Sequence, residues 1–291
     1  MKDLSMESVR TFGAFLLIVI CLFGCAPEEK APAGPATSEA RLRLYVFDCG
    51  ALEVDDVSMF DLTLEEAGTT ELFVPCYLID HPKGRLLWDL GLPLSVMTGE
   101  FALDEGSATL ERSVEDQLTE IELTKGDIDF VALSHLHFDH CGQAPVFADR
   151  KQLIQRLEYE AAFAEPQTVP FYDRQWYEAL ENADRTLLDG EHDVFGDGRV
   201  VIKPAPGHTP GHQILFLELE ETGPLVLSGD LYHYPANRSL RRPPKFNVDP
   251  AQTLVSMDAT EAFLKETGAT LWIEHDAKLA ATLRKSPEFY E

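Results

Sequence analysis

The sequence predicts an α/β fold for residues 41–291, and three features of the chain support this. Short apolar runs bounded by turn residues recur along the stretch and are typical of buried strands. Segments with helix signals lie between several of these runs. Four of the apolar runs end in loops that carry His or Asp, as strands do where α/β proteins assemble a site. No internal repeat and no linker interrupts residues 41–291, so we expect them to form one domain.

Strands are expected wherever an apolar or alternating run is bounded by turn-forming residues. The predicted strands cover residues 42–47, 72–80, 85–89, 128–133, 152–155, 186–188, 193–195, 199–203, 213–219, 225–230 and 270–276. Pro75 has no backbone N–H to give to a neighbouring strand, so it makes the second of these an edge strand or a bulged one.

Helices are expected in three segments, which are residues 113–123, 158–164 and 249–267. The third has the clearest end signals, with Asp249 as N-cap, Pro250 at the first helical position and Gly268 as the stop. Residues 92–110 are expected to be a long loop with apolar side chains, which suits a flap over a substrate or a partner surface. Residues 166–176 could form a pocket wall or a packed connection.

The first 25 residues have the features of an export signal. Lys2 and Arg10 flank a polar start, and the apolar run 12–23 that follows is too short to span a bilayer. The run ends in Leu-Phe-Gly-Cys, which resembles a bacterial lipobox and implies lipidation of Cys25. Since Ala26 rather than Asp follows, we expect an anchor in the outer membrane, facing the periplasm of a Gram-negative bacterium. A plain N-terminal anchor helix is the alternative.

Residues 26–40 predict a disordered linker between this anchor and the domain. The stretch contains three prolines among Ala, Glu, Thr and Ser, and it has no apolar periodicity. The membrane is therefore expected to be a partner only through the lipid.

The charge of the chain restricts its other partners. Asp and Glu number 50 against 24 Lys and Arg, and the formal net charge is -26. Nucleic acid is therefore not expected as a partner, and a highly anionic substrate is disfavoured unless bound metal ions invert the local field. The oligomeric state is left open, with a homodimer as one alternative.

Three cysteines remain after the signal: Cys49, Cys76 and Cys141. An odd number does not form a disulfide framework, even in an oxidising compartment. Cys49 could pair with Cys76, but we expect single thiols.

Potential metal ligands gather directly after the predicted strand 128–133. Within six positions the chain carries His135, His137, Asp139 and His140. Imidazole nitrogens and a carboxylate oxygen suit zinc-like ions. The first two side chains alternate as in an extended chain and could share one ion, whereas the other two turn elsewhere, which suggests two ions. The alternative, an accidental surface cluster, is disfavoured because four potential ligands follow a buried strand.

Three further strand ends offer ligands, namely His208, Asp230 and His275. Seven donors suit two ions, and Asp230 has two oxygens that can bridge them. Bridged ions hold a shared hydroxide whose pKa falls towards neutrality, which is a nucleophile that needs neither Ser nor Cys.

These motifs, in this order, resemble the metallo-β-lactamase superfamily: His-x-His-x-Asp-His, Pro-Gly-His-Thr-Pro-Gly-His, Ser-Gly-Asp and a late His. Residues 134–140, 207–213 and 274–276 are most similar to the N-acyl-homoserine lactonase branch. The resemblance runs from Leu42 to the C-terminus. It implies an αββα sandwich with a dinuclear site at one edge.

The resemblance also implies which residues bind which metal ion. The first ion would take His135, His137 and His208, the second Asp139, His140 and His275, with Asp230 as the bridge. The ions would be two Zn²⁺, with other divalent transition metals as alternatives.

The implied function is that of a quorum-quenching hydrolase, which opens N-acyl homoserine lactones by attack of a metal-bridging hydroxide. One alternative is a hydrolase of another ester, such as a phosphotriester, thioester or β-lactam. Another is a non-catalytic metal-binding surface lipoprotein. A neutral, amphipathic lactone fits the acidic protein, and Phe138 and residues 92–110 would contact its acyl chain.

One position departs from the family pattern. Well-known lactonases carry Tyr three residues after the bridging Asp, where this chain has His233, with Tyr232 and Tyr234 beside it. We expect His233 to form a hydrogen bond with the substrate carbonyl or leaving group. The catalytic candidates are Asp139, His233 and Tyr232. A surface or supporting position is the alternative for His233, and His212 is expected to be structural rather than a ligand.

Overall fold

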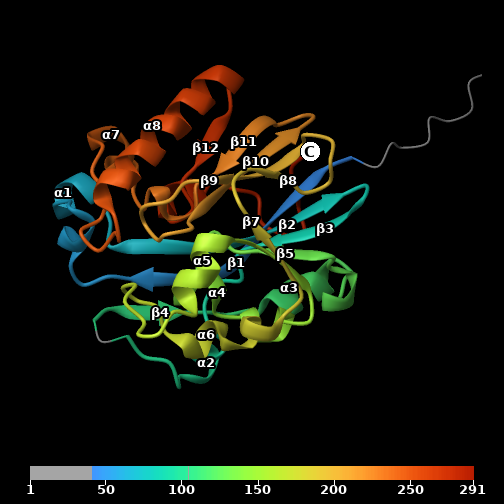
Figure 1. Cartoon of the computed structure of the whole chain (residues 1–291), viewed down its shortest axis with the longest axis horizontal. Helices are drawn as coiled ribbons and strands as arrows, with labels where there is room; N and C mark the ends of the chain where they lie inside the picture. The colour runs from blue at the N-terminus through green and yellow to red at the C-terminus, as the bar shows by residue number, and fades with distance from the viewer. Residues whose placement is uncertain (1–40, 104) are drawn as a thin grey trace, which may run out of the picture. The chain divides into compact units, whose positions relative to one another are not determined.

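Two β-sheets pack against each other in the computed structural model, which describes residues 41–103 and 105–291 (Figure 1). The strands of the first sheet are β1 (Arg43–Glu53), β2 (Glu71–His81), β3 (Gly84–Trp88), β4 (Ser107–Thr109), β5 (Phe130–Ala132), β6 (Lys151–Gln155) and β7 (Arg185–Leu188). Their order in the sheet is β4-β1-β2-β3-β5-β6-β7. Strands β3, β5, β6 and β7 are parallel to one another, so their carboxyl ends lie at one edge.

The second sheet contains the last five strands of the chain. They are β8 (His192–Asp193), β9 (Val200–Pro204), β10 (Gln213–Leu219), β11 (Gly223–Leu227) and β12 (Thr270–Trp272), in the order β12-β11-β10-β9-β8. Strand β11 is parallel to β12, and the other pairs are antiparallel.

Helices cover the outer face of each sheet (Figure 1). They are α1 (Leu64–Ala67), α2 (Ser95–Thr98), α3 (Val114–Glu120), α4 (Phe138–Cys141), α5 (Arg156–Ala162), α6 (Arg174–Tyr177), α7 (Pro235–Leu240), α8 (Pro250–Thr267) and α9 (Ala277–Ala280). Short 3-10 segments are η1 (Val57–Phe60), η2 (Lys125–Asp127), η3 (Ala144–Phe147), η4 (Glu178–Asn182) and η5 (Gly229–Leu231). Helix α8 lies over the second sheet, and α3 to α6 lie beside the first.

The alternation of side chains along the strands produces the four layers. In β1, Leu44 and Val46 point into the core between the sheets, while Tyr45 and Phe47 point to the core beneath the outer helices. Successive strand residues face opposite sides, so one strand can serve both cores. The same alternation in β10 sends Leu215 to the inner core and neighbouring residues towards α8. The predicted αββα sandwich is therefore confirmed.

The helix predicted from its end signals matches α8. Asp249 accepts a hydrogen bond from the backbone of Gln252, and Gly268 ends the helix with a φ of 71°. Residues 92–110, expected to be a loop, contain α2 and β4 as well, because β4 finds a partner in β1.

Pro75 lies in β2, which is paired on both sides, so the edge-strand alternative is wrong. The irregularity that the bulge alternative expected lies in the partner strand β1. Asp48 pairs with Pro75, and the register of β1 shifts between Asp48 and Ala51. An irregular partner strand accommodates a residue that has no N–H.

The expectation of single thiols is wrong for two of the three cysteines. Cys49 and Cys76 form a disulfide with a Cα–Cα distance of 5.7 Å, because β1 and β2 are neighbours in the sheet. Cys141 is a free, buried thiol.

In the part of the chain that the structure describes, no helix has both the length and the apolar character needed to cross a bilayer. The signal at residues 1–25, the lipidation site Cys25 and the linker at 26–40 lie outside the described residues. The predictions made for them stay predictions.

Candidate metal centre

The predicted ligands lie where strands of the two sheets end. His135 and His137 lie in the loop after β5, Asp139 and His140 follow in α4, and His208 follows β9. Asp230 belongs to η5, directly after β11, and His275 follows β12. Because the sheets pack face to face, these strand ends meet at one edge of the sandwich. All seven side chains are buried.

His135, His137 and His208 form a tight group that we call the three-histidine cluster. Nε2 of His135 lies 2.9 Å from Nδ1 of His137, and Nε2 of His208 lies 3.2 Å from both. Nitrogens that bind one zinc ion tetrahedrally at about 2.0–2.1 Å are about 3.3 Å apart, so two of the three separations match a zinc-like ion and the third is shorter.

Asp139, His140 and His275 form a second group, the mixed cluster. Nε2 of His140 lies 3.2 Å from Nε2 of His275. Oδ2 of Asp139 is 3.8 Å from the first of these nitrogens and 3.6 Å from the second. Two imidazoles and one carboxylate at these distances make a second candidate ion site.

The carboxylate of Asp230 lies between the two clusters. Oδ1 is 3.1 Å from Nε2 of His140 and 2.9 Å from Nε2 of His275. Oδ2 is 3.2 Å from Nε2 of His208 and 3.5 Å from Nε2 of His135. One oxygen therefore faces each cluster, which is the arrangement that a bridging ligand needs.

The outer nitrogen of each of these five imidazoles lies within hydrogen-bond distance of an oxygen atom, which orients the ring. The pairs are His135 with Ser134 Oγ at 3.0 Å, His137 with Pro170 O at 3.1 Å, His140 with Asp89 Oδ2 at 2.8 Å, His208 with Asn247 Oδ1 at 2.9 Å and His275 with Phe73 O at 2.7 Å. When the outer nitrogen carries the proton, the inner nitrogen presents a lone pair to the centre.

The protonation of the site suits cation binding. Burial lowers the pKa of His135 and His137 well below the usual range, so both are neutral. Burial opposes ionisation of Asp230, yet the surrounding imidazoles, with His233 foremost, hold its pKa well below the usual range. Burial also opposes a charge on His275, but Asp230 raises its pKa to about 9, so an ion bound there would replace a proton. The donor set fits two zinc-like ions.

Two supporting residues were not recognised in the sequence. Asp89, after β3, accepts hydrogen bonds from Ser134 N at 2.6 Å and Ser134 Oγ at 2.8 Å and also holds His140. Asn247 holds His208. For Asp89 a signal was available, because it stands before a Gly-containing turn at the end of an apolar strand, as the predicted ligands do.

His212 supports the site, as expected, and is not among its ligands. Its Nδ1 lies 2.9 Å from the carbonyl oxygen of Ala205, and its Nε2 accepts a hydrogen bond from the backbone N–H of Asp230 at 2.9 Å. Burial lowers the pKa of His212 to about 3, so the neutral ring can act as donor at one nitrogen and acceptor at the other.

A cavity of about 580 Å³ opens onto the centre. Its apolar wall includes Leu52, Met59, Phe60, Leu103, Phe138 and Phe246. Leu103 comes from the segment expected to be a substrate flap or a partner surface, and Phe171, another lining residue, comes from the segment expected to form a pocket wall or a connection. The segment η1, to which no role was assigned from sequence, supplies Met59 and Phe60.

His233 lines this cavity and contacts the carboxylate between the clusters. Its Nε2 lies 3.0 Å from Oδ2 of Asp230, and its Nδ1 is buried without a hydrogen-bond partner among the described residues. Burial lowers the pKa of His233 to about 4, so the ring is neutral at pH 7. The position is close enough to the centre for a role in catalysis.

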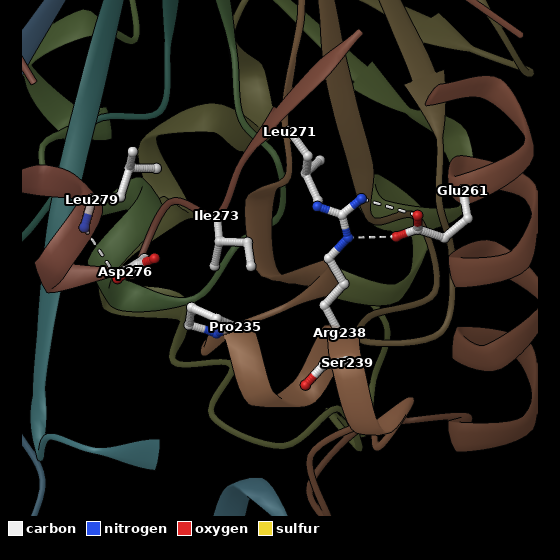
Figure 2. Close-up of a pocket in the computed structure, with 8 residues that line it drawn as sticks. All are labelled: Pro235, Arg238, Ser239, Glu261, Leu271, Ile273, Asp276 and Leu279. Carbon is white, nitrogen blue, oxygen red and sulfur yellow. Dashed lines mark hydrogen bonds and ion pairs between the residues drawn. The ribbon is translucent and has the colours of Figure 1, made fainter. Parts of the chain in front are cut away.

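Tyr232 requires a correction, because the structure does not place it in the site. Its backbone is extended, so its side chain points to the opposite side from that of His233. Its hydroxyl donates to Oε1 of Glu261 at 3.1 Å. Glu261 forms part of a different pocket, of about 480 Å³, where it is paired with Arg238 at 2.7 and 3.0 Å (Figure 2). Among the described residues that line that pocket there is no histidine.

Comparison with known proteins places the chain in a family. The model of the metallo-beta-lactamase superfamily matches residues 69–270. N-acyl homoserine lactonase AttM of Azorhizobium caulinodans is 29% identical over 266 residues, which cover 86% of this chain and 99% of AttM. N-acyl homoserine lactonase AiiA of Bacillus thuringiensis subsp. kurstaki is 28% identical over 255 residues, with coverage of 85% and 98%.

Solved structures agree with the sequence comparison. A quorum-quenching N-acyl homoserine lactone lactonase superimposes with a TM-score of 0.73 at 27% identity, covering 86% of this chain and 98% of that one. The dizinc lactonase AidC, at 18% identity and a TM-score of 0.62, shares the fold. Since the relatives are hydrolases, the chain is an enzyme of the hydrolase class. It belongs to the metallo-β-lactamase superfamily.

Proposed function

We propose that the protein is a dinuclear zinc hydrolase that opens the lactone ring of N-acyl homoserine lactones, and that it thereby quenches quorum sensing. The observation that carries the proposal is the placement of Asp230, with one oxygen towards each cluster, beside a largely apolar cavity. The similarity to lactonases along most of the chain supports it.

In this reaction the metal ligands, His233 and the apolar wall of the cavity would have separate roles. Two bound Zn²⁺ ions would supply Lewis acidity and an activated water to the ester carbonyl. The two clusters and Asp230 would hold the ions beside the cavity. His233 would donate a hydrogen bond to the carbonyl or to the leaving oxygen, as neutral imidazole can. The apolar wall would exclude water and receive the acyl chain.

The charge of the cavity supports a neutral substrate. Five carboxylates line it, from Asp55, Asp56, Glu105, Asp139 and Asp230, and no Lys or Arg occurs among its described lining residues. An anionic substrate such as S-lactoylglutathione would meet repulsion at the cavity mouth. An uncharged lactone with an apolar tail would not.

Metal content and substrate preference test the proposal together. Protein purified without chelator and supplied with zinc should contain about two ions per chain, as two clusters of three ligands with a bridging carboxylate require. It should hydrolyse short- or long-chain homoserine lactones faster than paraoxon, S-lactoylglutathione or nitrocefin. Elemental analysis that finds one ion or none would remove the dinuclear site. Rapid hydrolysis of another ester without any ring opening would assign the enzyme to a different branch of the superfamily.

We also propose that the protein is lipid-anchored at Cys25 in the outer membrane, facing the periplasm. The lipobox-like sequence and the Cys49–Cys76 disulfide support this, because disulfides persist in oxidising compartments outside the cytoplasm. Wild-type protein should fractionate with membranes, and Cys25→Ser should be released. The same soluble behaviour of both proteins would reject the lipobox.

A further inference from the structure

A buried carboxylate outside the ligand set joins three loops of the metal centre. Glu158 belongs to α5, shortly after β6, and is 1% exposed. It accepts hydrogen bonds from Leu136 N at 3.0 Å, Thr209 Oγ1 at 2.8 Å and Gly211 N at 2.9 Å. The hydroxyl of Tyr172 is a fourth donor. A single side chain therefore connects segments that are far apart in the sequence.

Each of these segments either carries a ligand of the three-histidine cluster or contacts one. Leu136 lies between two of its ligands, and Thr209 follows the third, His208. The loop of the fourth donor includes Pro170, whose carbonyl oxygen lies 3.1 Å from Nε2 of His137. The mixed cluster is carried by α4 and by the segment after β12, and Asp89 after β3 orients it. None of the four described donors to Glu158 lies in these segments.

We propose that Glu158 is a positioning residue that sets the metal affinity of the three-histidine cluster and leaves that of the mixed cluster unchanged. The inference rests on the proposed function, because it requires that the two clusters bind ions. It assigns a role to a residue that is neither a ligand nor a group in contact with substrate.

The chemistry of the four donors explains why a carboxylate is needed. Oε1 faces the backbone N–H of Leu136 and the tyrosine hydroxyl, and Oε2 faces the backbone N–H of Gly211 and the threonine hydroxyl. A hydroxyl can rotate and accept, but a backbone N–H can only donate. The amide of Gln has one oxygen, so in either orientation its NH₂ group would face one of the two N–H groups. Gln has nearly the shape of Glu but leaves a buried donor unpaired.

The space around the carboxylate is also restricted. A Cβ on Gly211 would lie 2.3 Å from the backbone nitrogen of Glu158, so the histidine-bearing loop packs directly on the start of α5. Displacement of the carboxylate would therefore move the loop of His208 rather than be absorbed by a gap.

Two single-cluster backgrounds make the test specific. Asp139→Ala should leave the three-histidine cluster as the main ion site, and His208→Ala should leave the mixed cluster. Zn²⁺ affinity of the full chain is measured in each background, with and without Glu158→Gln, by equilibrium dialysis against a chelator. In the first background we expect Glu158→Gln to weaken binding by about 10–100-fold, the usual effect of losing a residue that orients a metal ligand. In the second background the affinity should be unchanged.

Equal weakening in both backgrounds, or none in either, would overturn the inference. If the wild-type chain bound no zinc, the proposed function itself would fail, which is a different result. Tyr172→Phe is the milder variant if Glu158→Gln does not fold, because it removes one donor and keeps the carboxylate, and it should weaken only the three-histidine cluster. Glu261→Gln, a change of the same kind in the pocket of Figure 2, should alter neither affinity.

Discussion

Replacing Asp230 with alanine should remove both ions and abolish measurable turnover. Each oxygen of this carboxylate lies within 3.2 Å of an inner nitrogen of a different cluster, so one substitution removes a ligand from each. The affinities should fall by more than the roughly 10–100-fold that follows the loss of an orienting partner, because a ligand itself is lost. Elemental analysis and a lactone assay on the same preparation measure both effects.

Two further variants control for general damage to the site. Asp139→Ala should mainly affect the ion of the mixed cluster and leave one ion per chain. Asp230→Asn keeps one carboxamide oxygen, so it should retain part of the metal that the alanine variant loses. Full metal content together with full turnover in Asp230→Ala would show that the residue does not bridge.

Replacing His233 with alanine should lower turnover by about 10²–10³-fold while two ions remain bound, as when a single oxyanion donor is removed. The expectation follows from the position of Nε2, 3.0 Å from Asp230 and beside the cavity. Turnover and metal content are measured together, because loss of an ion in His233→Ala would make the residue a ligand instead. Unchanged turnover would remove it from the mechanism.

Tyr232→Phe is the matched control for this experiment. It removes a hydroxyl from the adjacent residue, which points to Glu261 and away from the cavity. The variant should retain wild-type turnover.

Local signals explain which parts of the fold could be predicted from sequence. Helix α8 has the predicted bounds because its cap, its first-turn proline and its terminal glycine act within a few residues of each end. Strand β10 also has the predicted bounds, since an apolar run between turn residues defines it. Residues 92–110 were expected to be a loop because β4 depends on pairing with β1, which is distant in the sequence.

In the candidate site, too, some residues could be identified from the sequence and others could not. The seven ligands could be proposed because strand ends in an α/β fold meet at one edge, and the structure brings all seven together. Glu158 looks in the sequence like any glutamate of a short helix, since its four donors come from loops whose meeting depends on the whole fold. Tyr232 was misplaced because the direction of a side chain depends on backbone angles that the spacing does not reveal.

The Cys49–Cys76 bridge has a consequence for how the protein should be prepared. Gly91 packs so closely on the bridge that a Cβ at this residue would lie 2.3 Å from the Cβ of Cys49. The carbonyl oxygen of Gly91 also accepts a hydrogen bond from the backbone N–H of Gly142. Chain made in a reducing host would carry two thiols at this point. Residues 41–291 would then show three reactive thiols after denaturation instead of the single one at Cys141. A thiol titration before each assay would identify preparations in which the segment next to the metal loop lacks its covalent link.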